Sequence, residues 1–224
     1  LFPGEDILLH IDTETGRTEE IVSLKKYIGD GFAFAGVRMN HDETKLYADI
    51  RSYEHGDAHL LSIDPRNGEV TALDTNETVQ ACFGSEPRLL LTKNFMKLGT
   101  RTTADGTRVY TSLNDKPMET VVADEDFGNQ RPLGIGPPNF AHSSLLGKTD
   151  RIQGTGHIPD KCIWIAETSD GSMRKLCEGP YFWHSGASWD GEWIISDTNW
   201  PDEGLHLIHV ETGNFAYMCS PDAT

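Results

Sequence analysis

The feature that most constrains the fold of this chain is a short hairpin pattern that recurs along its 224 residues. Each copy consists of an apolar strand, an acidic or polar turn and a glycine, and a further strand follows. The five copies are LLHIDTETG ending at Gly16, LLSIDPRNG at Gly68, TVVADEDFG at Gly128, IWIAETSDG at Gly171 and LHLIHVETG at Gly213. The glycines are 52, 60, 43 and 42 residues apart. Recurrence at such a period is typical of repeat architectures.

A second element, strand–turn–strand, precedes most copies of the hairpin. RMNHDETKLYADI, RTTADGTRVYTSL and GASWDGEWIISDT place turns around Asp42, Asp105 and Asp190, and the less regular SSLLGKTDRIQGTG contains Asp150. Aspartate favours such turns because its side chain bonds to the following backbone. One repeat is therefore four short strands in about 40 to 50 residues, which is typical of a β-propeller blade.

We therefore expect an all-β fold, a single β-propeller domain over residues 1–224. Its blade repeats end near 16–24, 68–80, 128–135, 171–180 and 213–219. A single blade cannot bury both faces of its sheet, so blades stack around a channel. The alternative is a β-sandwich, which also has many short strands. A sandwich does not predict the same hairpin sequence five times.

The number of strands predicts about four to five blades. They are either a piece of a longer propeller, which is the preferred alternative, or a ring that closes in another way. The first hairpin lacks the strand pair that should precede it, and the last blade is complete by Cys219. The segment 80–103 is irregular, since RLLLTKNF reads as a strand and the next turn follows too soon for a full blade. A shortened blade or an added edge strand would explain this. A propeller cut short exposes an apolar face, which predicts instability or aggregation.

Composition limits the partners of the chain. The formal net charge of -16 disfavours nucleic acids and anionic membranes, because their phosphates would be repelled. No apolar run is long enough to cross a bilayer. An anionic ligand would need a local positive centre, such as a metal ion or a few arginines. The four cysteines have no C-x-x-C spacing. Cys162 and Cys177 flank one hairpin and can either form a disulfide or stay reduced and buried.

Two histidines are the best candidates for chemistry, because propellers place function on the loops that lead into the innermost strands. His184 stands six residues before Asp190, and His142 stands eight residues before Asp150 in the preceding blade. Two histidines that enter the same face from neighbouring blades predict a metal site or an acid–base pair. Either histidine alone is as well explained as a structural residue that bonds loop carbonyls.

Signatures of other enzyme classes are missing from the sequence. It contains no G-x-S-x-G, no G-x-x-x-x-G-K-[ST], no H-E-x-x-H and no dinucleotide fingerprint. The aromatic residues beside His184, namely Tyr181, Phe182 and Trp183, are most simply explained as packing residues of a blade.

Several segments resemble the seven-bladed oligogalacturonate lyases. They are FWHSGASWDGEWIISDT followed by GLHLIHVETG, RIQGTGHIPDKCIWIAETSDGSMRKL, and LGTRTTADGTRVYTSL. The resemblance covers most of the chain and implies that its four to five blades are an incomplete part of a seven-bladed ring. TolB-like and related propellers share the Asp-Gly and Thr-Gly elements.

The resemblance implies a cytoplasmic enzyme that cleaves short anionic pectic oligouronides by β-elimination with the help of Mn²⁺. It implies that His142 is the base and that His184 is a metal ligand. A glutamine and two closely spaced histidines, further ligands in that family, would come from a blade after Thr224. The family also has an arginine near the leaving group. Arg131 is its nearest match, although in a different register.

Two functions thus remain open. The first is a metal-assisted lyase, or a piece of one, in which a cation stabilises the charge that builds beside the uronate carboxylate. The second is a non-catalytic TolB-like propeller that acts as a binding or scaffold module.

Overall fold

The computed structural model describes residues 6–52, 57–83, 86–94, 98–102, 104, 108–112, 117–136, 140–156, 160–199 and 204–220. Within these residues the elements are β1 (Ile7–Ile11), β2 (Thr18–Ser23), the 3-10 helix η1 (Lys25–Tyr27), β3 (Ala33–Met39), β4 (Leu46–Ser52), β5 (Asp57–Ile63), β6 (Val70–Leu73), β7 (Thr78–Cys82), β8 (Arg88–Lys93), β9 (Leu98–Thr102), β10 (Arg108–Ser112), β11 (Glu119–Asp124), β12 (Arg131–Pro132), β13 (Ala141–Leu145), β14 (Arg151–Gly156), β15 (Cys162–Glu167), β16 (Met173–Glu178), β17 (Phe182–Ala187), β18 (Trp193–Thr198), β19 (Gly204–His209) and β20 (Phe215–Cys219). None of the described segments is a helix with the length and apolar content needed to span a membrane.

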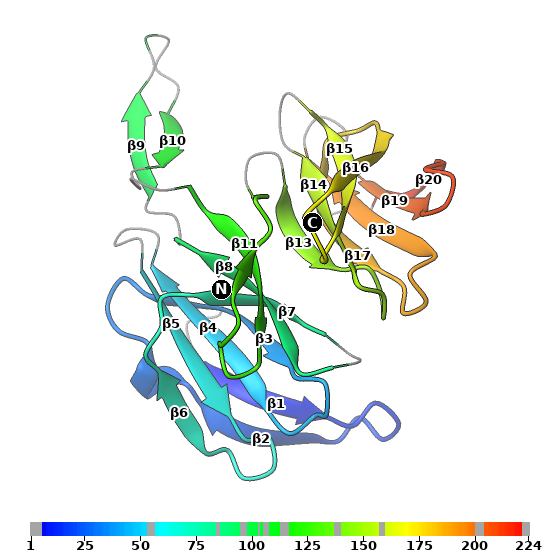
Figure 1. Cartoon of the computed structure of the whole chain (residues 1–224). Coiled ribbons are helices and arrows are strands. Elements are labelled where there is room, and N and C mark those ends of the chain that lie inside the picture. Colours follow the sequence, from blue (N-terminus) through cyan, green and yellow to red (C-terminus); the bar gives the residue numbers. More distant parts are fainter. Residues whose placement is uncertain are drawn as a thin grey trace. The chain divides into compact units, whose positions relative to one another are not determined.

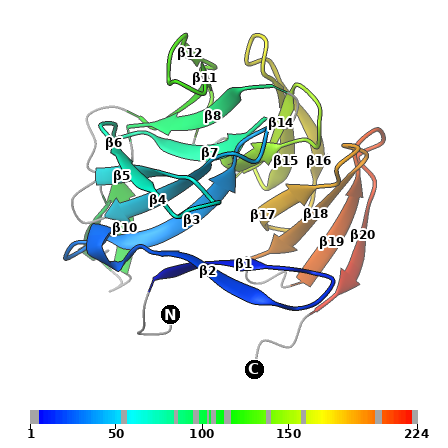
Figure 2. The same ribbon diagram turned by 90° about the horizontal axis from the view of Figure 1, so that it is seen from below.

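The strands form four-stranded sheets, as expected for propeller blades. Three sheets have sequential order, β3-β4-β5-β6, β13-β14-β15-β16 and β17-β18-β19-β20, and a fourth has the order β12-β11-β8-β7. Each consecutive pair in the three sequential sheets is antiparallel. Figure 2 shows β17, β18, β19 and β20 side by side in one twisted sheet. The all-β propeller prediction of about four to five blades is confirmed, with four full sheets and the β1–β2 hairpin.

The chain, drawn in Figure 1, divides into two compact units, and each unit contains its own cluster of buried apolar side chains. The first comprises Leu1–Cys82 and Thr92–Lys116, and the second comprises Phe83–Leu91 and Pro117–Thr224. The prediction that residues 1–224 form one domain stays a prediction.

In the first unit, the β1–β2 hairpin packs on the blade β3–β6. Leu8 of the hairpin contacts a cluster of fully buried side chains that includes Ile50 and Ile63. In the second unit, Ile163 and Ile165 of β15 pack in one cluster with Ile194 and other apolar side chains of the blade β17–β20. The same arrangement, one sheet laid on the next, therefore builds both cores.

The glycine of the repeated hairpin allows neighbouring sheets to approach closely. A Cβ atom on Gly68, Gly171 or Gly213 would lie only 2.3, 2.1 and 2.3 Å from a backbone oxygen of the preceding sheet or its flanking residue. These oxygens belong to residues 21, 133 and 176, each five positions after the glycine of the previous copy. Gly16 has a similar positive φ of 69°, but nothing lies within 4 Å of the place that a Cβ atom would take there. The sequence at this turn is therefore fixed by contact with a neighbouring sheet as well as by φ.

The prediction that RTTADGTRVYTSL forms the inner strands of the blade ending at Gly128 is wrong. Its two strands, β9 and β10, pair only with each other among the described residues, and β7 and β8 join β11 instead. A central strand covered on both faces needs a continuous apolar run. β8 provides it with Leu89, Leu90 and Leu91, all fully buried. Asp105, the predicted turn residue, lies outside the described residues.

The four cysteines are free thiols, so the disulfide alternative for Cys162 and Cys177 is not realised. Cys162 and Cys177 lie on the neighbouring strands β15 and β16. They are not opposite each other, because Cys177 pairs with Ile163 and Cys162 pairs with Glu178. Burial raises the pKa of each of the two thiols to about 11.

We expect Gly213→Ala to destabilise the protein by about 3 kcal/mol, because it adds overpacking to the strain of positive φ. Gly16→Ala is the matched control, since it has the same strain without the close contact, and it should cost about 1 kcal/mol. Urea unfolding followed by circular dichroism measures both. Equal losses for the two variants would contradict the close approach as the reason for glycine.

We expect alkylation at pH 8 to modify the exposed Cys219 first and Cys162 and Cys177 last. A thiol with a pKa of about 11 has roughly one thiolate per thousand molecules at that pH, and burial slows access further. Mass spectrometry of timed samples gives the order. A mass lower by two hydrogen atoms under non-reducing conditions would show a disulfide and contradict the assignment.

Candidate functional site

The two candidate histidines lie at equivalent β-bulges on the first strands of adjacent blades. In β13 the pairing jumps from Ala141 to Ser144, and in β17 it jumps from Phe182 to Ser185. In each case the bulged strand has more residues than the strand it faces, which re-aims the side chains of the bulge. His142 is in one bulge, and His184, 42 residues later, is in the other.

The bulges bring the two imidazole rings together. The ring centroids of His142 and His184 are 4.7 Å apart, edge to face, and the ring of Trp183 lies 5.0 Å from that of His142. His142 has a φ of 47°, which is uncommon for a residue with a side chain. Backbone strain of this kind is often found at functional sites. The sequence prediction that both histidines enter one face from neighbouring blades therefore matches their positions, while their chemical roles stay predictions.

Asp197 of β18 orients His184. One carboxylate oxygen accepts a hydrogen bond from the backbone N–H of His184 at 2.6 Å, and the other contacts its Nδ1 at 2.9 Å. Because a carboxylate accepts hydrogen bonds, this contact favours the tautomer with the proton on Nδ1, which leaves Nε2 as the free ring nitrogen of a neutral imidazole. The side chain of His184 is 60% exposed, so this nitrogen can be reached from solvent.

Gln153 fixes the two histidine-bearing strands to each other. Its side chain is fully buried and bonds the Ser144 hydroxyl at 2.6 Å and the Ser185 carbonyl at 3.0 Å. The Ser185 hydroxyl donates back to Gln153 Oε1 at 2.5 Å. Because both the nitrogen and the oxygen of this buried amide have hydrogen-bond partners, Gln153 sets the spacing of β13 and β17. The spacing of the two strands in turn sets the spacing of the rings.

The arrangement fits one ligand of a divalent cation. A histidine whose second nitrogen is bound by a carboxylate is the usual form of a metal-ligating histidine. Within the described ranges, however, no group of three or more His, Cys, Asp or Glu side chains is close enough to hold a metal ion. The described residues therefore supply an oriented imidazole and not a complete coordination sphere.

Arg131, the weak candidate for contact with substrate, lies in β12. Its guanidinium donates to the carbonyl oxygen of Ser169 at 2.8 Å and to that of Thr168. These bonds tie β12 to the turn after β15. In this position the arginine holds two parts of the second unit together.

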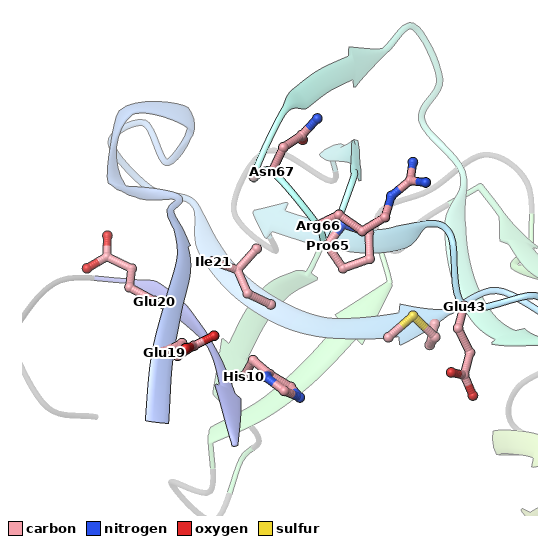
Figure 3. A pocket seen from close by; sticks show the side chains of 10 residues that line it. His10, Glu19, Glu20, Ile21, Glu43, Pro65, Arg66 and Asn67 are labelled. Atoms are coloured by element: carbon pink, nitrogen blue, oxygen red, sulfur yellow. The ribbon is translucent and has the colours of Figure 1, made fainter. Parts of the chain in front are cut away.

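A separate pocket of about 390 Å³ lies in the first unit and has a different character. Its polar lining includes His10, Glu19, Glu20 and Glu43. Figure 3 shows Glu20 and Glu43 directed to opposite sides, so their carboxylates do not converge on one ligand position. Arg66, also at the pocket, is bound through two nitrogens by Asp64. Glu20, Glu43 and Arg66 therefore do not converge on one ligand position, whereas His10 and Glu19 lie opposite each other in the β1–β2 pairing.

Sequence reasoning missed Asp197, since an aspartate in a strand carries no motif. It also missed a local repeat that would have strengthened the histidine pair. Phe140-Ala-His-Ser and Phe182-Trp-His-Ser are the same four-residue pattern 42 positions apart. Both phenylalanines are buried, at 1% and 0% exposure, and anchor the strands that carry the bulges.

No family model matches this sequence. No curated protein matches it either.

Solved structures do match, and the fold they share is the β-propeller. An oligogalacturonate lyase in complex with manganese has a TM-score of 0.66 and 16% identity over 98% of this chain and 61% of its own. An oligogalacturonate lyase from Vibrio parahaemolyticus has a TM-score of 0.59 and 13% identity over 97% of this chain and 61% of its own. TolB from Acinetobacter baumannii has a TM-score of 0.59 and 16% identity over 92% of this chain and 46% of its own.

The chain thus spans about three fifths of the length of these lyases and less of TolB. The TM-scores of 0.59 to 0.66 establish a common architecture, whereas identities of 13% to 16% leave the activity open. The chain is an all-β protein built from propeller blades, and its fold is similar to those of oligogalacturonate lyases and of TolB.

Proposed function

We propose that the paired histidines belong to a lyase that cleaves short anionic oligouronides by β-elimination. The observation that carries the proposal is the 4.7 Å separation of the His142 and His184 rings, with His184 held by Asp197. The fold likeness to oligogalacturonate lyases supports the substrate class.

His142 is the proposed base. In β-elimination a base removes the proton from C5 of the uronate, the electron pair forms the C4–C5 double bond, and the C4–O bond breaks. The departing oxygen then takes up a proton. An imidazole is suited to the first step because it changes protonation state near neutral pH.

His184 is the proposed metal ligand, through Nε2. A bound Mn²⁺ would neutralise the sugar carboxylate and so favour proton loss beside it. A concentrated positive centre is needed because the chain has a formal charge of -16 and would otherwise repel an acidic sugar. Asp197 would keep the imidazole aimed at the cation.

Arg131 is proposed only as a weak contact to the substrate. Its guanidinium would first have to leave the carbonyl oxygens of Thr168 and Ser169.

A binding or scaffold module of the TolB-like type is the second candidate. It is favoured by the incomplete set of metal ligands among the described residues and by the likeness to TolB. In that case the histidine pair would be a structural contact between blades.

The experiment is to follow the absorbance of the unsaturated product from di- and trigalacturonate, with and without Mn²⁺. We expect His142→Ala to lower kcat by about 100-fold or more, since a positioned base contributes that much. His184→Ala should mainly raise the Mn²⁺ concentration that is required. His10→Ala, in an exposed strand of the first unit, is the control. If Mn²⁺-dependent product never forms, or if the histidine variants behave like the control, the lyase proposal fails.

We expect Asp197→Asn to weaken Mn²⁺ binding by about 10-fold to 100-fold, because the partner of a ligating histidine sets its orientation and basicity. Paramagnetic broadening of the His184 ring signals during a Mn²⁺ titration measures this without any turnover. Asp170→Asn, which changes a turn carboxylate elsewhere in the unit, is the control. Unchanged broadening in Asp197→Asn would remove Asp197 from the site.

A further inference from the structure

A row of aromatic side chains leads away from the histidine pair. The ring centroid of Trp183 lies 5.0 Å from that of His142, and the ring centroid of Tyr181 lies 5.6 Å from that of Trp183. Phe182, between them in sequence, is instead fully buried in the core cluster of the second unit. Tyr181 and Trp183 are only half-buried, so part of each side chain faces solvent.

Lys161 stands at the far end of this row, with its Nζ 5.4 Å from the ring centroid of Tyr181. Backbone hydrogen bonds fix both residues. The Lys161 carbonyl accepts from the Gly179 N–H at 3.3 Å, and the Tyr181 carbonyl accepts from the Asn199 N–H at 2.7 Å. The lysine precedes β15 of one blade and reaches the residue that precedes β17 of the next. We call Lys161, Tyr181 and Trp183 the aromatic row.

The ammonium group of Lys161 differs in its charge partners from that of Lys175 in the same blade. Lys175 lies 5.5 Å from the ring centroid of Trp164 and forms an ion pair with Glu178. Among the residues that the structure describes, no carboxylate forms an ion pair with Lys161. Lys161 is half-buried in a chain with a formal charge of -16. A cation of this kind beside an aromatic ring is a local positive centre that can attract an anion.

A uronate residue has two features that match the aromatic row. The C–H groups on the face of its sugar ring can pack on an aromatic side chain. Its carboxylate is a charged acceptor for an ammonium group. The row begins at His142, the proposed base. An oligouronide whose reacting residue lies at the histidine pair could therefore place its next residue over Trp183, with the carboxylate directed to Lys161.

We propose that the aromatic row is a binding subsite for the uronate residue next to the reacting one, and that Lys161 binds the carboxylate of this neighbour. The choice of a uronate as the ligand rests on the proposed function. Such a subsite favours oligomers over single uronates. It also favours free carboxylates over methyl esters, in which the charge is absent. The positive centre that an acidic sugar needs would then be supplied partly by the chain itself.

The test compares the binding of trigalacturonate and of its fully methyl-esterified form by NMR titration without Mn²⁺. Lys161→Met removes the charge and keeps an apolar stem of similar length, so the fold should be retained. We expect this variant to raise the Kd of trigalacturonate by about 10-fold, because a charge-assisted hydrogen bond is lost. The Kd of the ester should change by less than about 2-fold, since the ester has no charge to bind. Lys161→Arg should retain most of the affinity for trigalacturonate.

Lys175→Met is the matched control, since Lys175 also lies beside an aromatic ring but is paired with Glu178. It should leave both Kd values unchanged. Trp183→Leu should weaken both ligands alike, because the ring contacts the sugar face and not the charge. Equal Kd values for Lys161→Met and Lys175→Met would overturn the proposal. So would a loss of affinity for both ligands in Lys161→Met, which indicates a structural role, or no binding of trigalacturonate at its highest soluble concentration.

These outcomes are separable from those of the lyase proposal. Binding that depends on Lys161, without any product when Mn²⁺ is added, would remove the lyase and retain the subsite. Product formation with an unchanged KM in Lys161→Met would retain the lyase and remove the subsite. If both proposals are correct, Lys161→Met raises the KM for trigalacturonate by about 10-fold with little change in kcat, because the contact is present in the ground state and in the transition state.

Discussion

The contact between a glycine turn and a backbone carbonyl of the preceding sheet is the constraint on which the rest of this molecule depends. It appears at Gly68, Gly171 and Gly213, where a single methyl group would collide with the oxygen. Because the two backbones touch there, the turn can come this close to the preceding sheet only without a side chain. Apolar side chains of one sheet, such as Ile163 and Ile165, then pack on side chains of the next sheet, such as Ile194. Their burial supplies stabilising free energy.

The candidate site is a result of the same packing. Each bulge on the first strand of a blade turns a histidine toward its neighbour, and buried Gln153 ties the two strands at one spacing. Asp197 adds orientation to His184 from within its own blade. The site thus combines one residue from each of two sheets with a carboxylate that fixes one of them. None of the three strands carries the site alone, since it forms only where the two sheets pack.

Much of this could be predicted from sequence because the repeat is visible in it. The five glycine-ended hairpins give the blades, and the matched positions of His142 and His184 before their turns place both on one face. The assignment of residues 101–113 to a blade failed because turn chemistry does not decide which strands become central, whereas the apolar run of β8 does. Asp197 and the carbonyl partners of Arg131 could not be predicted, since they depend on which strands lie side by side in space.

The left-handed backbone of His142 has a consequence for how this position can vary. Glycine and asparagine tolerate that conformation best among the amino acids, whereas a β-branched side chain there would carry a steric penalty. Substitution by glycine or asparagine would therefore relax the bulge and remove the imidazole at the same time. A variant at this position would thus gain backbone stability only by losing the ring that faces His184.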